Sequence, residues 1–235
     1  MIDQYDWPGG REAMLRFGPT NGPVVLAAMP LFEEANRTRA FIVTILRALA
    51  ERGIASALPD LPGTGESLTE TENTSLTDWQ SAFLSASASL NSGHGPVHGL
   101  AIRGGALLDS TARLASRWHF APVAGDGLVR DMLRTRLAAA KESGEEVDTN
   151  AIDPPGPPIE LAGNRISRAL LAELGQAVPM TAAPLRTVRL DTDTQPADHH
   201  IAGSPLWRRS EPGNDPALAR LLADDIAAWI ASCAG

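Results

Sequence analysis

The chain has little of what small secreted or membrane proteins rely on. Its 235 residues include one cysteine, Cys233, which excludes an internal disulfide and a cysteine-based metal site. No apolar run approaches the roughly 20 residues needed to span a bilayer. The first residues lack the basic and apolar regions of a signal peptide. These absences predict a cytoplasmic protein without a membrane span.

Positive charge is also scarce. The formal net charge is −8, and no basic run is longer than Arg208-Arg209. An acidic chain without a basic stripe is not expected to take nucleic acid or an anionic membrane as its main partner. Its length fits one domain, 1–235, and its composition is typical of a globular protein. We expect no cofactor and no metal, and the oligomeric state is not predicted.

Short apolar runs alternate with helical patterns along the chain, after a lead-in over residues 1–23 that reads as an edge hairpin or irregular segment. The predicted strands besides the one near residue 100 are Pro23–Met29, Ile54–Leu58, Trp118–Ala124, Leu185–Leu190 and a weaker final one, Pro205–Arg209. The predicted helices are Thr38–Arg52, Thr77–Leu90 and Asp215–Ser232. This alternation predicts an α/β fold with a doubly wound, mostly parallel sheet.

The periodicity changes between residues 126 and 180. Two helical segments, Asp126–Ser143 and Arg165–Leu174, flank Asp153–Pro158, where the density of proline excludes a helix. We therefore expect residues 126–180 to be an insertion between late strands.

Residues 95–108 read as a short buried strand, a glycine-rich turn and then a helix that starts near Gly104. In α/β-hydrolases this transition is the nucleophile elbow, G-x-S-x-G, whose strained turn lifts a serine above the sheet. The matching residues here run from Ala101 to Gly105, and the serine position holds Arg103. Arginine is not deprotonated near neutral pH. The sequence therefore predicts an α/β-hydrolase fold, with residues 126–180 as a helical lid, that lacks its usual nucleophile.

Several segments resemble a narrower group of the α/β-hydrolase superfamily, the second of two hydrolase-like proteins associated with the exosortase A/PEP-CTERM system of Gram-negative bacteria. They cover most of the chain from about residue 24 onward: Pro30–Arg39, Pro59–Ser67, Gly99–Ala106, Leu133–Leu137, Ile159–Gly163 and Ser204–Asp215. That group is similar in carrying arginine at the elbow. The resemblance thus implies that Arg103 is a family trait, and it supplies no reaction.

Two interpretations of Arg103 remain open. With the backbone N–H groups of Gly104 and Gly105 at a helix start, its guanidinium would clamp a carboxylate or phosphate. Alternatively, Arg103 pairs with an internal carboxylate and fills an inactive pocket. The carboxylates considered for that pairing are Glu33, Glu34 and Asp126. Only the first interpretation predicts a bound anion.

The other two positions of a serine triad follow the nucleophile in the order acid, then histidine. Asp191 and Asp193 come directly after a predicted strand, in the stretch of the acid, where aspartates often only cap a strand. The loop before the last helix contains no histidine. His199 and His200 lie earlier, in a polar segment, and are weak candidates for a base.

The loop Pro30–Arg39 follows the strand whose end lends an oxyanion N–H in this fold. Five of its residues are expected at the mouth of the pocket: Phe32, Glu33, Glu34, Asn36 and Arg39. Equally, Thr38 caps the following helix, with the two glutamates placed favourably near its N-terminus.

Three functions follow from these patterns. The first is a protein without serine-hydrolase chemistry that binds a small anion or assists exosortase-linked export or polysaccharide assembly. The second is an ester or acyl hydrolase that uses His199 or His200 with a non-standard nucleophile such as Ser67 or Ser204. The third is an interaction module. Losing the serine costs about 10⁶ in kcat in a protease of this mechanistic type, which favours the first.

Overall fold

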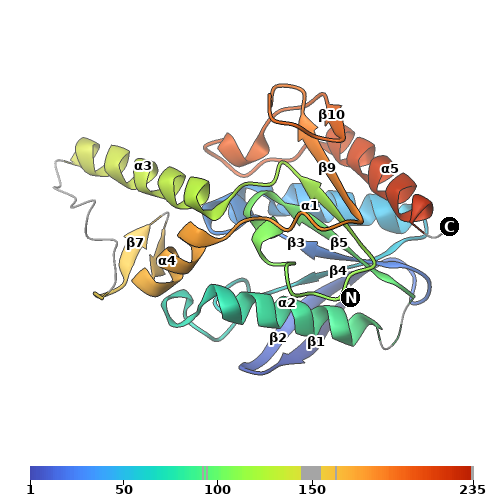
Figure 1. Ribbon diagram of the computed structural model, residues 1–235, viewed down its shortest axis with the longest axis horizontal. Coiled ribbons are helices and arrows are strands. Elements are labelled where there is room, and N and C mark those ends of the chain that lie inside the picture. Colours follow the sequence, from blue (N-terminus) through green and yellow to red (C-terminus); the bar gives the residue numbers. More distant parts are fainter. Residues whose placement is uncertain (92, 94, 144–154, 162, 234–235) are drawn as a thin grey trace.

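The computed structural model describes residues 1–91, 93, 95–143, 155–161 and 163–233. Eight strands form one sheet in the order β1-β2-β4-β3-β5-β6-β9-β10 (Figure 1). The strands are β1 (Ile2–Trp7), β2 (Gly10–Phe17), β3 (Val24–Ala28), β4 (Ala55–Pro59), β5 (Val97–Ile102), β6 (Ser116–Phe120), β9 (Leu185–Leu190) and β10 (His199–Ile201). The hairpin β1–β2 is antiparallel to its neighbour β4, and every pair from β4 to β10 is parallel.

Helices cover both faces of this sheet. On one face, α1 (Glu33–Glu51) and α5 (Pro216–Ser232) pack against residues such as Val25. On the other, α2 (Leu76–Asn91), α3 (Gly125–Ser143) and α4 (Arg168–Gln176) pack into a second cluster that contains Leu26. All five residues of β3 are buried because both faces are covered, which explains its continuous apolar run. The predicted doubly wound, mostly parallel sheet is confirmed.

Several predicted elements differ from the structure. The predicted strand Trp118–Ala124 ends at Phe120 as β6, and the predicted helix Arg165–Leu174 begins at Arg168 as α4. Helix α1 begins at Glu33 rather than Thr38, whose hydroxyl donates to the Glu34 carbonyl inside the helix. The elbow leads into one 3₁₀ segment, η2 (Arg103–Leu107), and not into a regular helix. The final strand is β10, because His199–Ile201 pairs with β9, whereas the predicted strand Pro205–Arg209 contains the 3₁₀ segment η4 (Leu206–Arg208).

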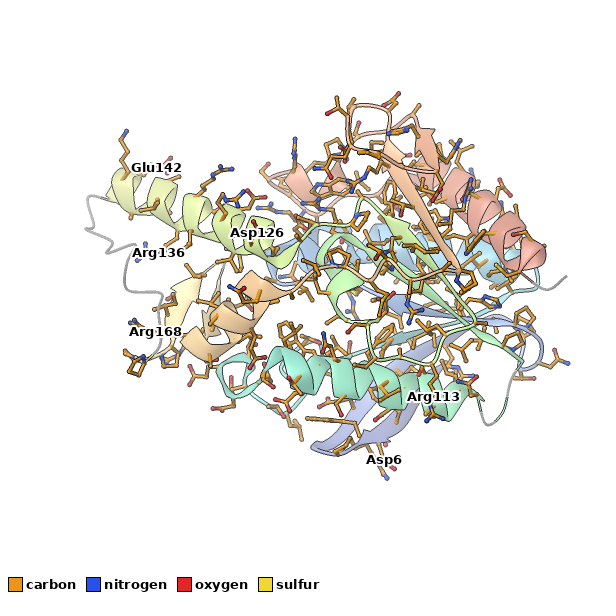
Figure 2. The ribbon with its side chains drawn as sticks, in the orientation of Figure 1. Asp6, Arg113, Asp126, Arg136, Glu142 and Arg168 are labelled. Carbon is orange, nitrogen blue, oxygen red and sulfur yellow. The ribbon has the colours of Figure 1, made fainter. Side chains whose placement is uncertain are left out.

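The segment between β6 and β9 contains α3, α4 and an unpredicted hairpin, β7 (Ile159–Leu161) and β8 (Asn164–Ile166). Helix α3 projects beyond the sheet (Figure 1), with Asp126 near the sheet and Glu142 at the far end (Figure 2). Residues 144–154, the start of the predicted proline-rich stretch among them, lie outside the described residues. Within the described chain, no helix is both long and apolar enough to cross a bilayer.

Candidate functional site

A cavity of about 490 Å³ lies at the edge of the sheet where the parallel strands have their carboxyl ends. Its wall is built from the loops that follow these strands: Arg103 after β5, Ala121–Ala124 after β6, and Thr192–Gln195 after β9. Trp207 in η4 and the first turns of α3 complete it. This edge is where open α/β sheets bind their ligands, because the connecting loops converge there.

The backbone at Arg103 has the strained geometry of a nucleophile elbow. Its φ of 55° lies in the left-handed region, which costs a non-glycine residue about 1–3 kcal/mol. Two residues on, a Cβ at Gly105 would lie 2.4 Å from the carbonyl oxygen of Ala28, so only glycine fits. The sharp turn and its small residue are therefore both present, with arginine at the position that the turn presents.

The guanidinium of Arg103 is held from three sides. Its Nε lies 3.3 Å from both carboxylate oxygens of Glu34, and its Nη2 donates to Oε1 at 3.1 Å. Its Nη1 donates to the Ala121 carbonyl at 3.3 Å. The indole of Trp207 lies under the guanidinium carbon, 4.9 Å from the ring centroid, within the range of a cation–π contact.

Glu34 is thus the partner of Arg103 among the three carboxylates considered from the sequence. Glu33 instead pairs with Arg37 one helical turn on, and Asp126 with Arg130. The Arg103–Glu34 pair is largely buried, with side chains 13% and 15% exposed. The inactive-pocket interpretation requires an internal carboxylate that pairs with Arg103, and Glu34 is one. The anion-clamp interpretation requires space for an anion beside Arg103, and the cavity offers it.

Burial and charge move the pKa values of Glu34 and Asp193, both of which interact with Arg103, in opposite directions. Burial raises the pKa of Glu34, and the charge and hydrogen bonds of Arg103 offset this only in part. Burial acts on Asp193 as well, but the Gln195 amide, Arg189 and Arg103 together hold the pKa of Asp193 below its ordinary value. The lowered pKa favours the ionised form of Asp193, which lines the cavity.

Solved structures of similar shape identify the architecture. Est1E from Butyrivibrio proteoclasticus, solved with ferulic acid bound, has a TM-score of 0.61 at 14% identity over 97% of this chain and 99% of its own. Alpha/beta hydrolase domain-containing protein 10 from mouse has a TM-score of 0.60 at 15% identity, over 99% of both chains. The bottromycin epimerase BotH, in complex with bottromycin A2, has 0.51 at 13%, over 95% and 98%.

This chain has the α/β-hydrolase fold. Sequence comparison adds nothing to this result, since no protein-family model and no curated protein matches the chain. At such low identities the structural likeness shows the α/β-hydrolase fold alone. The chemistry of the site has to be argued from its own residues.

In chain order, Asp193 lies in the stretch after β9 where the acid of a triad was expected, and Trp207 lies in the loop before α5 where the histidine was expected. Asp193 follows β9 and pairs with Arg189 at 2.8 Å, whereas Asp191 is exposed and does not line the cavity. In the loop between β10 and α5, Trp207 stacks on Arg103. Arg103 and Trp207 thus contact each other, and neither side chain can act as nucleophile or general base.

The other candidates for catalysis, Ser67, His199, His200 and Ser204, do not line the cavity. His199 and His200 are exposed on β10, and His200 Nε2 lies 3.2 Å from the Gln195 carbonyl. Ser67 donates to Glu12 at 3.0 Å. A His98–Ser116 hydrogen bond of 2.8 Å joins the amino ends of β5 and β6, at the opposite edge of the sheet. Among the described residues no three His, Cys, Asp or Glu side chains gather to hold a metal.

The five residues expected at one pocket mouth do not line the same cavity as Arg103. Glu34 faces Arg103, whereas Phe32, Asn36 and Arg39 line a separate cavity. Gly104 and Gly105 are buried and do not line the Arg103 cavity. The site residues that sequence reasoning missed are Arg189, Trp207 and Arg208. The signal for Trp207 was available, since the loop without a histidine offers a tryptophan in its place.

Proposed function

We propose that this chain is an α/β-hydrolase-fold protein without serine-hydrolase chemistry that binds a small carboxylate or phosphate in the Arg103 cavity. The observation that carries this proposal is the contact between Arg103, on the strained turn after β5, and Trp207 in the loop before α5. A guanidinium offers planar, permanent positive charge that matches a carboxylate or phosphate. BotH, an epimerase, illustrates that this fold is not tied to hydrolysis.

The charges that line the cavity support an anionic ligand. Four arginines face it, namely Arg103, Arg130, Arg189 and Arg208. The first three have carboxylate partners, in Glu34, Asp126 and Asp193. Arg208 forms no ion pair with any residue in the described part of the chain, and its side chain is exposed. Of the five N–H groups of Arg103, the contacts above occupy three, which leaves two for a ligand.

The resemblance to the exosortase-associated group gives this ligand a context. We assign the protein an accessory role beside export or polysaccharide assembly, in which the bound anion is a small intermediate or regulator. Residues 126–180 would then act as a lid, because Asp126 and Asp131 of α3 contribute to the cavity wall. Closure of the lid on the anion would exclude water from the pair Arg103–Glu34.

Calorimetric titration with citrate and with inorganic phosphate tests the anion site. Arg208→Gln is expected to weaken binding about 10-fold or more, the loss of one charge-assisted contact. Removing the pair as Arg103→Met/Glu34→Gln is expected to abolish it without leaving a buried charge. Arg209→Gln is the matched control, because Arg209 is an exposed neighbour that does not line the cavity. Equal affinity in all four proteins would refute the anion site.

A panel of p-nitrophenyl esters separates this proposal from the hydrolase alternative. Wild-type protein is expected to give no turnover above buffer, since the described residues hold no nucleophile next to a histidine at the cavity. Turnover abolished by Ser67→Ala, Ser204→Ala or His200→Ala, and unaffected by Arg103→Ala, would establish a hydrolase with a non-standard nucleophile instead.

A further inference from the structure

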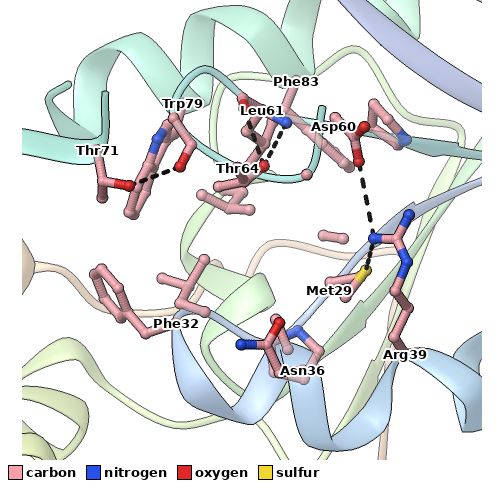
Figure 3. Close-up of a pocket in the computed structure, with 18 of the residues that line it drawn as sticks. Met29, Phe32, Asn36, Arg39, Asp60, Leu61, Thr64, Thr71, Trp79 and Phe83 are labelled. Atoms are coloured by element: carbon pink, nitrogen blue, oxygen red, sulfur yellow. Dashed lines mark hydrogen bonds and ion pairs between the residues drawn. The ribbon is translucent and has the colours of Figure 1, made fainter. Parts of the chain in front are cut away.

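A second cavity, of about 200 Å³, lies between α1 and α2 beside the carboxyl ends of β3 and β4 (Figure 3). It shares no lining residue with the Arg103 cavity. Its walls come from the β3–α1 loop, the first turns of α1, the loop 59–65 after β4, and α2. The two cavities are therefore separate and require separate explanations.

One end of this second cavity is aromatic. The rings of Phe32 and Trp79 lie 5.6 Å apart between centroids and are tilted by 58°. Phe83 extends the same apolar wall. The indole N–H of Trp79 is satisfied by the Pro62 carbonyl at 2.8 Å, so the ring presents only apolar surface to the cavity. An apolar cavity of about 150 Å³ is enough to take up benzene, so this one has room for a ring and a short substituent.

Phe32, which forms part of this wall, has a strained backbone conformation. Its φ of 56° with ψ of −131° is an outlier for a bulky aromatic residue, and no side chain caps α1 there. Such strain persists only where the surroundings enforce it, and it is concentrated at ligand sites. Here the strained residue places its ring opposite Trp79 (Figure 3).

The other end of the cavity is cationic and incompletely satisfied. Arg39 Nη1 lies 3.9 Å from Asp60 Oδ1, beyond hydrogen-bond distance, and 4.0 Å from the sulfur of Met29. Asp60 Oδ2 already accepts from the Glu66 amide at 3.1 Å. The Arg39 side chain is 43% exposed. The side-chain amide of Asn36 lies between the two ends of the cavity in Figure 3 and forms no hydrogen bond with any residue that the structure describes.

We propose that this second cavity binds a small monocarboxylate with an apolar ring. The ring lies against Phe32 and Trp79, and the carboxylate accepts from the guanidinium of Arg39 and the amide of Asn36. An arginine fork matches a carboxylate in a bidentate manner, which the loose contact with Asp60 does not use. This site does not depend on Arg103 and is proposed in addition to the anion site.

Titration with 3-phenylpropionate and its neutral analogue 3-phenylpropionamide tests the proposal. Arg39→Gln is expected to weaken binding of the acid at least 10-fold and to leave the affinity for the amide unchanged, because only the acid uses the charge. Ala35→Leu, which fills the cavity from the first turn of α1, is expected to abolish binding of both compounds. Arg47→Gln, an exposed position on the same helix, is the control and is expected to bind both compounds like wild type.

Three results would overturn the assignment. One is no binding of 3-phenylpropionate to wild type at millimolar concentration. Another is equal affinity of Arg39→Gln and wild type for the acid. The third is a loss in Arg208→Gln as large as in Arg39→Gln, which would place the compound in the Arg103 cavity. Arg208→Gln tests binding of citrate and phosphate, and Arg39→Gln tests binding of 3-phenylpropionate. Failure of one proposed site is therefore distinguishable from failure of the other.

Discussion

The Arg103→Met variant is expected to lose about 3–5 kcal/mol of unfolding free energy at neutral pH, the cost of breaking a buried ion pair from one side. Without the guanidinium, Glu34 remains 15% exposed with its charge uncompensated by Arg103. Adding Glu34→Gln removes that charge, and the double variant is expected to recover most of the loss. Urea denaturation of the four proteins measures the coupling between the two positions.

Glu33→Gln is the control for this cycle. Glu33 also pairs with an arginine, Arg37, but its side chain is 37% exposed, so its loss is expected to stay within about 1 kcal/mol. Additive losses in the double variant, with no recovery, would show that Arg103 stabilises the fold by some means other than its pairing with Glu34.

The raised pKa of Glu34 predicts a pH dependence of the unfolding free energy that the same urea denaturation can measure. Burial raises the pKa of Glu34, so the folded protein holds this proton more tightly than the unfolded chain does. Its contribution to stability is complete below the ordinary pKa of the carboxyl group and falls as pH rises through the raised value. In Arg103→Met this decrease in stability should extend to higher pH, because Arg103 no longer lowers the pKa of Glu34. In Glu34→Gln the decrease should be absent, because the titrating group is gone.

The sheet and most of its strands were predictable because a parallel sheet covered on both faces demands continuous apolar runs. Leu185–Leu190 has the predicted bounds. The last strand was not predictable in this way, since β10 is a three-residue edge strand of which His199 and His200 are exposed. Leu206 and Trp207 gave the apolar signal instead, because both are buried in a 3₁₀ turn.

The sequence could narrow the ion-pair partner of Arg103 to three carboxylates, but it could not select Glu34 among them. Glu33 and Glu34 are adjacent, and successive helical side chains differ by about 100° in direction. Which of them faces the elbow depends on where α1 begins, and the sequence favoured Thr38 as the cap over the true start at Glu33. Asn36 and Arg39 line the second cavity, whereas Glu34 pairs with Arg103, so the predicted mouth residues do not share one site.

Gly105→Ala is expected to lower the free energy of unfolding by about 3 kcal/mol or more, at the upper end of the cost of overpacking. The added Cβ would lie 2.4 Å from the carbonyl oxygen of Ala28 and 2.5 Å from that of Met29. Both contacts are backbone atoms at the end of β3, so no change of side-chain rotamer relieves them. Thermal unfolding followed by circular dichroism measures the loss.

Gly104→Ala is the matched control, one residue away in the same turn. The nearest atoms to its Cβ would be side-chain atoms of Leu31 and Leu128, at 3.3 Å, and leucine side chains can shift by a few tenths of an ångström. Its loss is expected to stay within about 1 kcal/mol. Equal losses in the two variants would contradict a close contact specific to Gly105. A large difference would instead mean that the elbow, with Arg103 in place of serine, is held by the close approach of η2 to the end of β3.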